Sequence, residues 1–244
     1  SGELTAYARD LNLNDLLFRY GVRINPDLIA DKHCDVIPVE VGNVGGQSQK
    51  QLLPWPYSPL LLPGSDNVIV KNQADVLANF ANSIDLVEAE GVNKTVLLSS
   101  SNNATTLATP TIVQLNSLQT VEDVKEYNKK NIPVAVLLEG KFTSMFANRA
   151  TQSQLDTLRS YNIPFLREAI TPGKVIVVSD ADIVMNQVSE TIGPLPMGTN
   201  KYTKVSYANK DFFLNCTEYL ANKKNILEAR AKDYTLRLLD VKKT

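Results

Sequence analysis

The sequence is poor in the side chains that nucleophilic enzymes and zinc proteins depend on. It has one histidine, His33, and two cysteines, Cys34 and Cys216, in 244 residues. No Cys-x-x-Cys pair occurs, which excludes a thiolate zinc site, and no Gly-x-Ser-x-Gly elbow occurs. A Ser-His-Asp or Cys-His enzyme would have to use His33, and on a strand its neighbour Cys34 would point to the opposite face. The usual nucleophilic chemistries are therefore not indicated.

The two cysteines admit two interpretations. They could form one disulfide in an oxidising compartment, or they could be separate buried thiols, since free cysteine is among the most buried residue types. A domain of this size does not need a covalent staple, so we expect Cys34 and Cys216 to be reduced and buried.

Charge of one sign and long apolar runs are also missing. The chain has 25 basic and 26 acidic residues, so no basic surplus indicates nucleic acid or an anionic membrane surface as a partner. No apolar run approaches the roughly 20 residues of a membrane span. The chain opens Ser1-Gly2-Glu3 without a signal peptide, and we interpret it as an excised soluble fragment of a larger protein.

Apolar periodicity predicts strands alternating with helices. The strands are expected at 35–41, 94–99, 132–139 and 175–178, and the helices at 4–20, 121–128, 152–161 and 209–221. Such alternation favours a single α/β domain over 1–244, a three-layer sandwich with a mostly parallel, Rossmann- or flavodoxin-like sheet. The proline-rich segment described below would be a small β appendage.

The most informative stretch is 174–186. Its four β-branched residues, 175–178, predict a strand buried on both faces, and polar ends of such strands form sites in open α/β sheets. Asp180 and Asp182 follow directly. As a carboxylate pair they could hold Mg²⁺, whereas Asp180 could simply cap the next helix. We favour the cap.

A second segment, Pro54–Pro63, holds Trp55 and Tyr57 between prolines that forbid helix and central strand. The two aromatic side chains could pack onto the core, or they could form a contact surface for a partner. If the domain acts by contact, this is the surface we expect.

Asp31, His33 and Asp35 share one parity and could form a metal-binding face, although a surface strand end explains them more simply. We expect no metal and no cofactor.

Several stretches together resemble one family, the auxiliary, so-called substrate-binding component of the gliding-motility-associated ABC transporter of Bacteroidetes. They follow one another along nearly the whole chain: Leu16-Leu-Phe-Arg-Tyr-Gly-Val-Arg-Ile-Asn25, Pro54-Trp-Pro-Tyr-Ser-Pro59, Ser83-Ile-Asp85, Val96-Leu-Leu-Ser-Ser-Ser101, Val178-Ser-Asp-Ala-Asp-Ile183, Pro194-Leu-Pro-Met-Gly198, Asn209-Lys-Asp-Phe-Phe-Leu-Asn215 and Arg230-Ala-Lys-Asp-Tyr-Thr-Leu-Arg-Leu-Leu-Asp240.

The resemblance implies an extracytoplasmic (periplasmic) domain that works with an ABC transporter permease and ATPase and is held at the inner membrane by segments outside this chain. It supplies no catalytic residue. It implies a non-enzymatic domain that binds a protein or a ligand, with Trp55, Tyr57, Asp180 and Asp182 as candidate binding residues. The alternative is a metal-dependent, hydrolase-like enzyme that uses Asp180 and Asp182.

Overall fold

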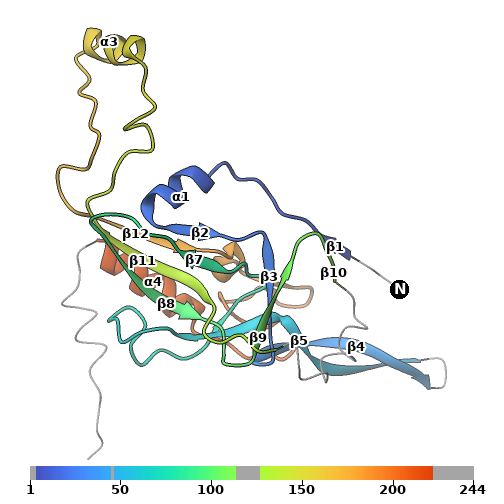
Figure 1. The fold of residues 1–244 in the computed structure, drawn as a ribbon. Coiled ribbons are helices and arrows are strands. Elements are labelled where there is room, and N and C mark those ends of the chain that lie inside the picture. The colour runs from blue at the N-terminus through green and yellow to red at the C-terminus, as the bar shows by residue number, and fades with distance from the viewer. Residues whose placement is uncertain (1–3, 45–46, 114–126, 222–244) are drawn as a thin grey trace, which may run out of the picture.

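The fold is built on one curled antiparallel sheet (Figure 1). The computed structural model describes residues 4–44, 47–113 and 127–221. The main sheet has the order β12 (Gly173–Val178), β11 (Pro133–Gly140), β8 (Val92–Ser99), β5 (Gln47–Pro63) and β4 (Cys34–Val44), with β6 (Val76–Leu77) also paired to β5. Every pairing between the described strands is antiparallel.

Short strand pairs and a few helices complete the described chain. The pairs are β1 (Leu4–Ala6) with β10 (Thr111–Val113), β2 (Val22–Ile24) with β7 (Ile84–Leu86), β3 (Asp27–Asp31) with β9 (Ala104–Ala108), and β13 (Val188–Ser189) with β14 (Gly193–Pro194). The helices are α1 (Asn14–Tyr20), α3 (Gln152–Ser160), α4 (Asn209–Leu220) and the 3-10 helix η1 (Ala181–Val184).

The predicted α/β sandwich with a parallel sheet is therefore wrong. A parallel arrangement requires a crossover helix that packs on the sheet between consecutive strands. The helix between β11 and β12 is α3, which buries no residue and stands away from the sheet at the end of a long projection (Figure 1). The chain therefore returns beside the strand it left, and β12 runs antiparallel to β11.

The apolar runs that suggested a parallel sheet come from strands that are covered on both faces. Residues 134–138 of β11 are fully buried, and from Ala135 on they alternate between two hydrophobic clusters, with Leu137 in one and Val136 and Leu138 in the other. An inner strand covered on both faces is apolar in either kind of sheet, so the run does not distinguish parallel from antiparallel pairing. β12 is an edge strand, and of its side chains only Val177 is buried.

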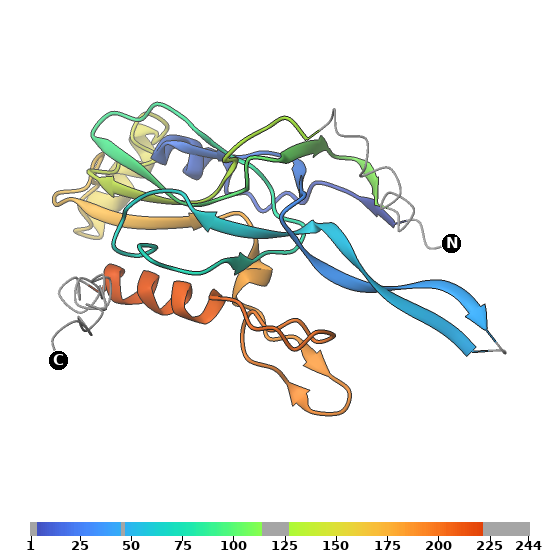
Figure 2. The same ribbon diagram turned by 90° about the horizontal axis from the view of Figure 1, so that it is seen from below.

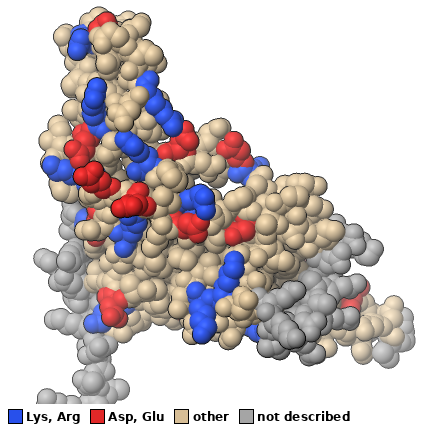
Figure 3. All heavy atoms as spheres, in the orientation of Figure 1, with Lys and Arg blue, Asp and Glu red and all other residues tan. Residues whose placement is uncertain are grey.

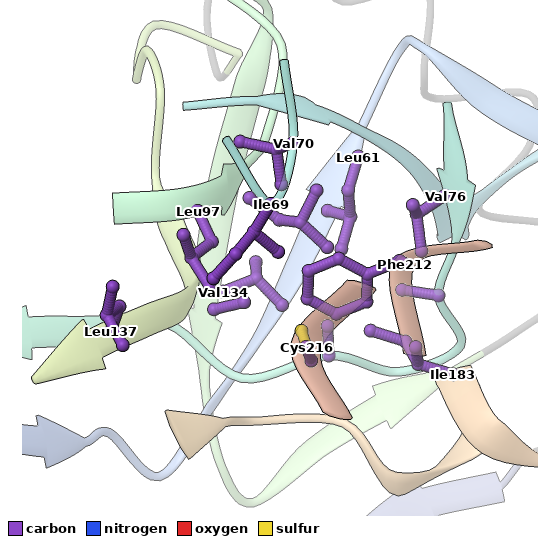
Figure 4. Close-up of a cluster of buried hydrophobic side chains, with 14 of the residues drawn as sticks. Leu61, Ile69, Val70, Val76, Leu97, Val134, Leu137, Ile183, Phe212 and Cys216 are labelled. Carbon is purple, nitrogen blue, oxygen red and sulfur yellow. The ribbon is translucent and has the colours of Figure 1, made fainter. Parts of the chain in front are cut away.

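Helix α4 covers one face of the sheet, as its apolar spacing predicts. Phe212 and Cys216 point from it into a cluster that includes Leu61, Leu97 and Ile183 (Figure 4). The other face is covered by α1 and β2 through Leu17 and Val22. The predicted helices 152–161 and 209–221 are thus confirmed in position. The predicted helix 121–128 lies mainly outside the described residues.

The predicted helix 4–20 forms only in its second half. Its last residues are α1, while its first residues pair as β1 with β10. Gly21 ends α1 with a φ of 100°, and its N–H donates to the carbonyls of Leu17 and Phe18. The positive φ is what favours glycine here, and a Cβ would also lie only 3.0 Å from the Cβ of Ala89.

The proline-rich segment is part of the main sheet, not an appendage. β5 runs through all of it and pairs in turn with β4, β6 and β8. The prediction that its prolines exclude a helix is confirmed, whereas the prediction that they exclude an inner strand is wrong, since β5 lies between β8 and β4 in the sheet. Pro54 lies opposite Val36, and Pro38 lies opposite Leu52. Because proline has no N–H, it fits only positions that donate no ladder bond. The far part of the β4–β5 hairpin extends beyond the rest of the sheet (Figure 2).

Candidate functional site

Asp180 joins two segments that are distant in the sequence. One carboxylate oxygen accepts a hydrogen bond of 2.8 Å from the N–H of Asp182, which caps η1, and the other accepts one of 2.7 Å from the N–H of Asn79. The predicted capping role is confirmed. Burial raises the pKa of this carboxyl from 3.8 to about 6, although the two N–H groups act in the opposite direction.

Asp182 lies beside a cavity of about 240 Å³. The cavity is lined by polar residues (Asn79, Asp182, Asn186, Gln187, Asn209), by apolar residues (Leu77, Phe80, Met185) and by Gly198. Asp182 is exposed, whereas Asp180 is buried behind it. The two predicted acidic residues are thus neighbours at one site, but only Asp182 is exposed there.

The floor of this cavity is held by Asn209, the first residue of α4. Its side chain exchanges two hydrogen bonds with the backbone of Leu77 and donates a third, of 3.0 Å, to the carbonyl of Ile183. Gly198 lies against it with a φ of 75°, and a Cβ there would meet the Asn209 amide at 2.5 Å. Asn209 therefore fixes the shape of the cavity.

The other polar side chains of the lining are only partly used by the fold. Asn79 Oδ1 accepts from Ser58, Asn186 Nδ2 donates to the Leu195 carbonyl, and Gln187 Oε1 accepts from the N–H of Lys201. The carboxylate of Asp182 makes no hydrogen bond or ion pair with any described residue. The lining thus offers one anionic group and several amide groups.

Exposed apolar side chains border this cavity. Phe80 is 43% exposed and Met185 is 56% exposed, and both line it. The same segment continues with Val184, Val188 and Ile192, which are also exposed. The Asp182 carboxylate thus lies among amide groups and beside two exposed apolar side chains, a mixture of charge and apolar surface that protein contact sites use.

Trp55 and Tyr57 are buried, at 8% and 5% exposure. They pack with Leu28, Ala30 and Val113, and their ring centroids lie 5.1 Å apart. Phe80 is stacked on Tyr57 with a centroid distance of 6.0 Å, so it joins this aromatic cluster to the cavity. The placement matches the packing interpretation, and a binding role for Trp55 and Tyr57 stays a prediction.

Several cavity residues carry no signal in the sequence. Asn79 and Phe80 come from the turn after β6, about a hundred residues before Asp180. Phe80 has a φ of 54°, an unusual conformation for a bulky residue that no local sequence pattern indicates. Gly198, within Pro194-Leu-Pro-Met-Gly198, is the one wall residue whose type suggests a backbone constraint.

Asp31, His33 and Asp35 do not converge. Asp31 is fully buried and accepts from the N–H and hydroxyl of Ser101, while the His33 ring lies 2.7 Å from a carboxylate oxygen of Asp75. Asp35 accepts from the Asn200 amide, 165 residues further along the chain. Among the described residues, no group of three or more His, Cys, Asp or Glu is arranged to hold a metal ion.

Both cysteines are free thiols. Cys216 is buried, while Cys34 is half-buried, so the expectation of two buried thiols holds fully for Cys216 alone. Burial raises the pKa of each thiol to about 12, and nearby Asp31 adds to the effect at Cys34. Neither is an activated nucleophile.

None of the helices in the described part of the chain has both the length and the apolar character that a membrane crossing needs. No curated protein and no solved structure matches the chain significantly. A family model described as an ABC-type uncharacterized transport system matches residues 1–216, which is most of the chain. The chain therefore belongs to this family, as an auxiliary component of an ABC-type transport system.

Proposed function

We propose that this domain acts by contact, without chemistry of its own, as an extracytoplasmic part of an ABC transporter complex, and that the cavity beside Asp182 receives a side chain of the permease. The observation that carries the proposal is the cavity itself, in which the Asp182 carboxylate lies among amide groups and beside the exposed side chains of Phe80 and Met185. The family resemblance supports a periplasmic position at the inner membrane, an anchor outside this chain, an ATPase partner and an association with gliding motility.

The chemistry of the lining indicates which partner side chain would fit. Asp182 is the one charged residue of the lining, and Phe80 and Met185 present apolar surface beside it. An arginine or lysine of the partner would pack its aliphatic stem on these two residues and place its cation on the carboxylate. The amides of Asn186 and Gln187 would complete the polar contacts.

The hydrolase alternative has little support in this geometry. A metal bridged by Asp180 and Asp182 needs both carboxylates at one open position, but Asp180 is buried and holds two backbone N–H groups, whereas Asp182 is exposed. Of the two carboxylates that the hydrolase alternative needs for a metal ion, only that of Asp182 is open to solvent.

The test is charge reversal at the cavity in the full-length protein, co-expressed with its permease and ATPase. Asp182→Arg is expected to reduce co-purification of the permease by at least about tenfold, because it replaces a paired charge with a repulsive one. Glu88→Arg makes the same charge change at an exposed site outside the cavity lining and is expected to leave the complex intact.

Thermal unfolding of both variants controls for stability. Neither should be strongly destabilised, since the Asp182 carboxylate has no hydrogen bond or ion pair with the described residues that the substitution would break. Normal co-purification by Asp182→Arg would refute the cavity as the docking site. An equal loss in both variants would show that general charge, and not this site, governs assembly.

A further inference from the structure

A long arm, residues 141–172, projects from the sheet between β11 and β12 (Figure 1). Its two legs are joined near the base, where the Ser144 N–H donates to the Arg167 carbonyl and the Ala169 N–H donates to the Phe142 carbonyl, each at 2.9 Å. Helix α3 forms its far end. The arm therefore reaches well beyond the surface of the domain.

Helix α3 is ordered by its own sequence and not by packing. Thr151 and Gln154 form a reciprocal capping box, yet none of the helix residues is buried. A helix that contributes nothing to the core is expected to be kept for a contact outside the domain.

Large apolar side chains are exposed along both legs of the arm. Their exposed fractions are 54% for Phe146, 72% for Tyr161, 52% for Ile163, 50% for Leu166 and 73% for Ile170. Single exposed apolar residues are ordinary, but five within one projecting segment indicate a surface that is covered in the working protein.

The arm carries a small excess of cations within a nearly neutral chain. Its charged residues are four cations (Lys141, Arg149, Arg159, Arg167) and two anions (Asp156, Glu168), whereas the whole chain has 25 and 26. Figure 3 shows Lys and Arg side chains spread along the arm among uncharged residues and a few acidic ones. Two of these cations form ion pairs at the surface, Arg149 with Asp15 of α1 and Arg159 with Asp156 of the arm, and the net excess of the arm is two positive charges.

We propose that the arm is a membrane-contact element that lays its apolar side chains into the interface of an anionic bilayer, with its arginines among the lipid headgroups. Tyrosine with aliphatic residues and arginine is the composition of such interfacial segments. A fluid bilayer accepts apolar groups that are spread over two legs, whereas docking on a protein requires a shaped counterpart. The excess of cations complements anionic lipid.

The test is flotation of the 244-residue chain with vesicles of phosphatidylcholine, with or without phosphatidylglycerol. The chain is expected to float with the anionic vesicles and at least about tenfold less with the neutral ones, because each cation near the surface contributes about a fivefold factor. Tyr161→Ser with Ile163→Ser should abolish flotation. Arg159→Gln with Arg167→Gln should reduce the preference for anionic vesicles several-fold.

The matched control is Tyr7→Ser with Ile112→Ser, which removes a tyrosine and an isoleucine of similar exposure, 74% and 52%, outside the arm. This control should float as the unmodified chain does. Flotation that is absent, or that is unchanged by both arm variants, overturns the proposal. The arm would instead belong to a protein interface if two results came together: the unmodified chain does not float, and the Tyr161→Ser, Ile163→Ser variant of the full-length protein loses the permease.

Discussion

Asp180→Asn tests whether burial or hydrogen bonding controls the carboxyl behind the cavity. Asp180 is 8% exposed and accepts two backbone N–H groups. The bonds favour the ionised form and burial opposes it, and burial dominates, since the pKa is raised from 3.8 to about 6. Asparagine keeps the shape of the side chain and removes the titration.

The sign follows from proton linkage. Because the folded pKa is above the unfolded one, the folded state binds more protons between the two values, so the stability from this group is complete below pH 3.8 and is lost as the pH rises through about 6. Relative to about pH 8, the unmodified chain should gain about 1.4 kcal/mol over Asp180→Asn at about pH 5, and about 2 kcal/mol at about pH 4.5.

The assay is urea unfolding of both proteins at these pH values, followed by the fluorescence of Trp55, the single tryptophan of the chain. Only the difference between the two free energies of unfolding is compared, so other carboxyl groups cancel. A difference that does not change with pH would refute the reasoning. A difference of the opposite sign would show that the two N–H groups outweigh burial.

Two further predictions concern the core and the thiols. Trp55→Ala should lower the free energy of unfolding by roughly 3–5 kcal/mol, as is usual for a buried aromatic, and a loss below about 1 kcal/mol in urea unfolding would contradict the packing interpretation. Cys34 and Cys216 should stay reduced, so the intact mass under non-reducing conditions should show no loss of two hydrogens, and a thiol reagent at about pH 8 should modify Cys216 only after unfolding.

Local features of the fold could be predicted from the sequence, and pairing could not. The strands at 94–99, 132–139 and 175–178 are where their apolar runs place them, because such runs form strands in any covered sheet. The direction of pairing depends on what joins the strands. The sequence of α3 indicates a helix correctly, but nothing in it shows that the helix stands away from the sheet.

The same division applies to the candidate site. The Asp180 cap is a local pattern, and it was predictable from the strand end that precedes it. The contact of Asp180 with Asn79 spans 101 positions, and Phe80 reaches the cavity through a φ of 54°. Neither follows from periodicity or spacing, so the acidic pair could be found in the sequence but not the cavity.

The most direct test of the central claim is site-specific photo-crosslinking from the cavity in the assembled complex. A benzophenone side chain in place of Met185, which is 56% exposed and lines the cavity, would be compared with one in place of Leu86, which is 47% exposed on β7. We predict a crosslink to the permease from position 185 and none from position 86. No crosslink from 185, or equal crosslinking from both positions, would contradict a docking role for this cavity.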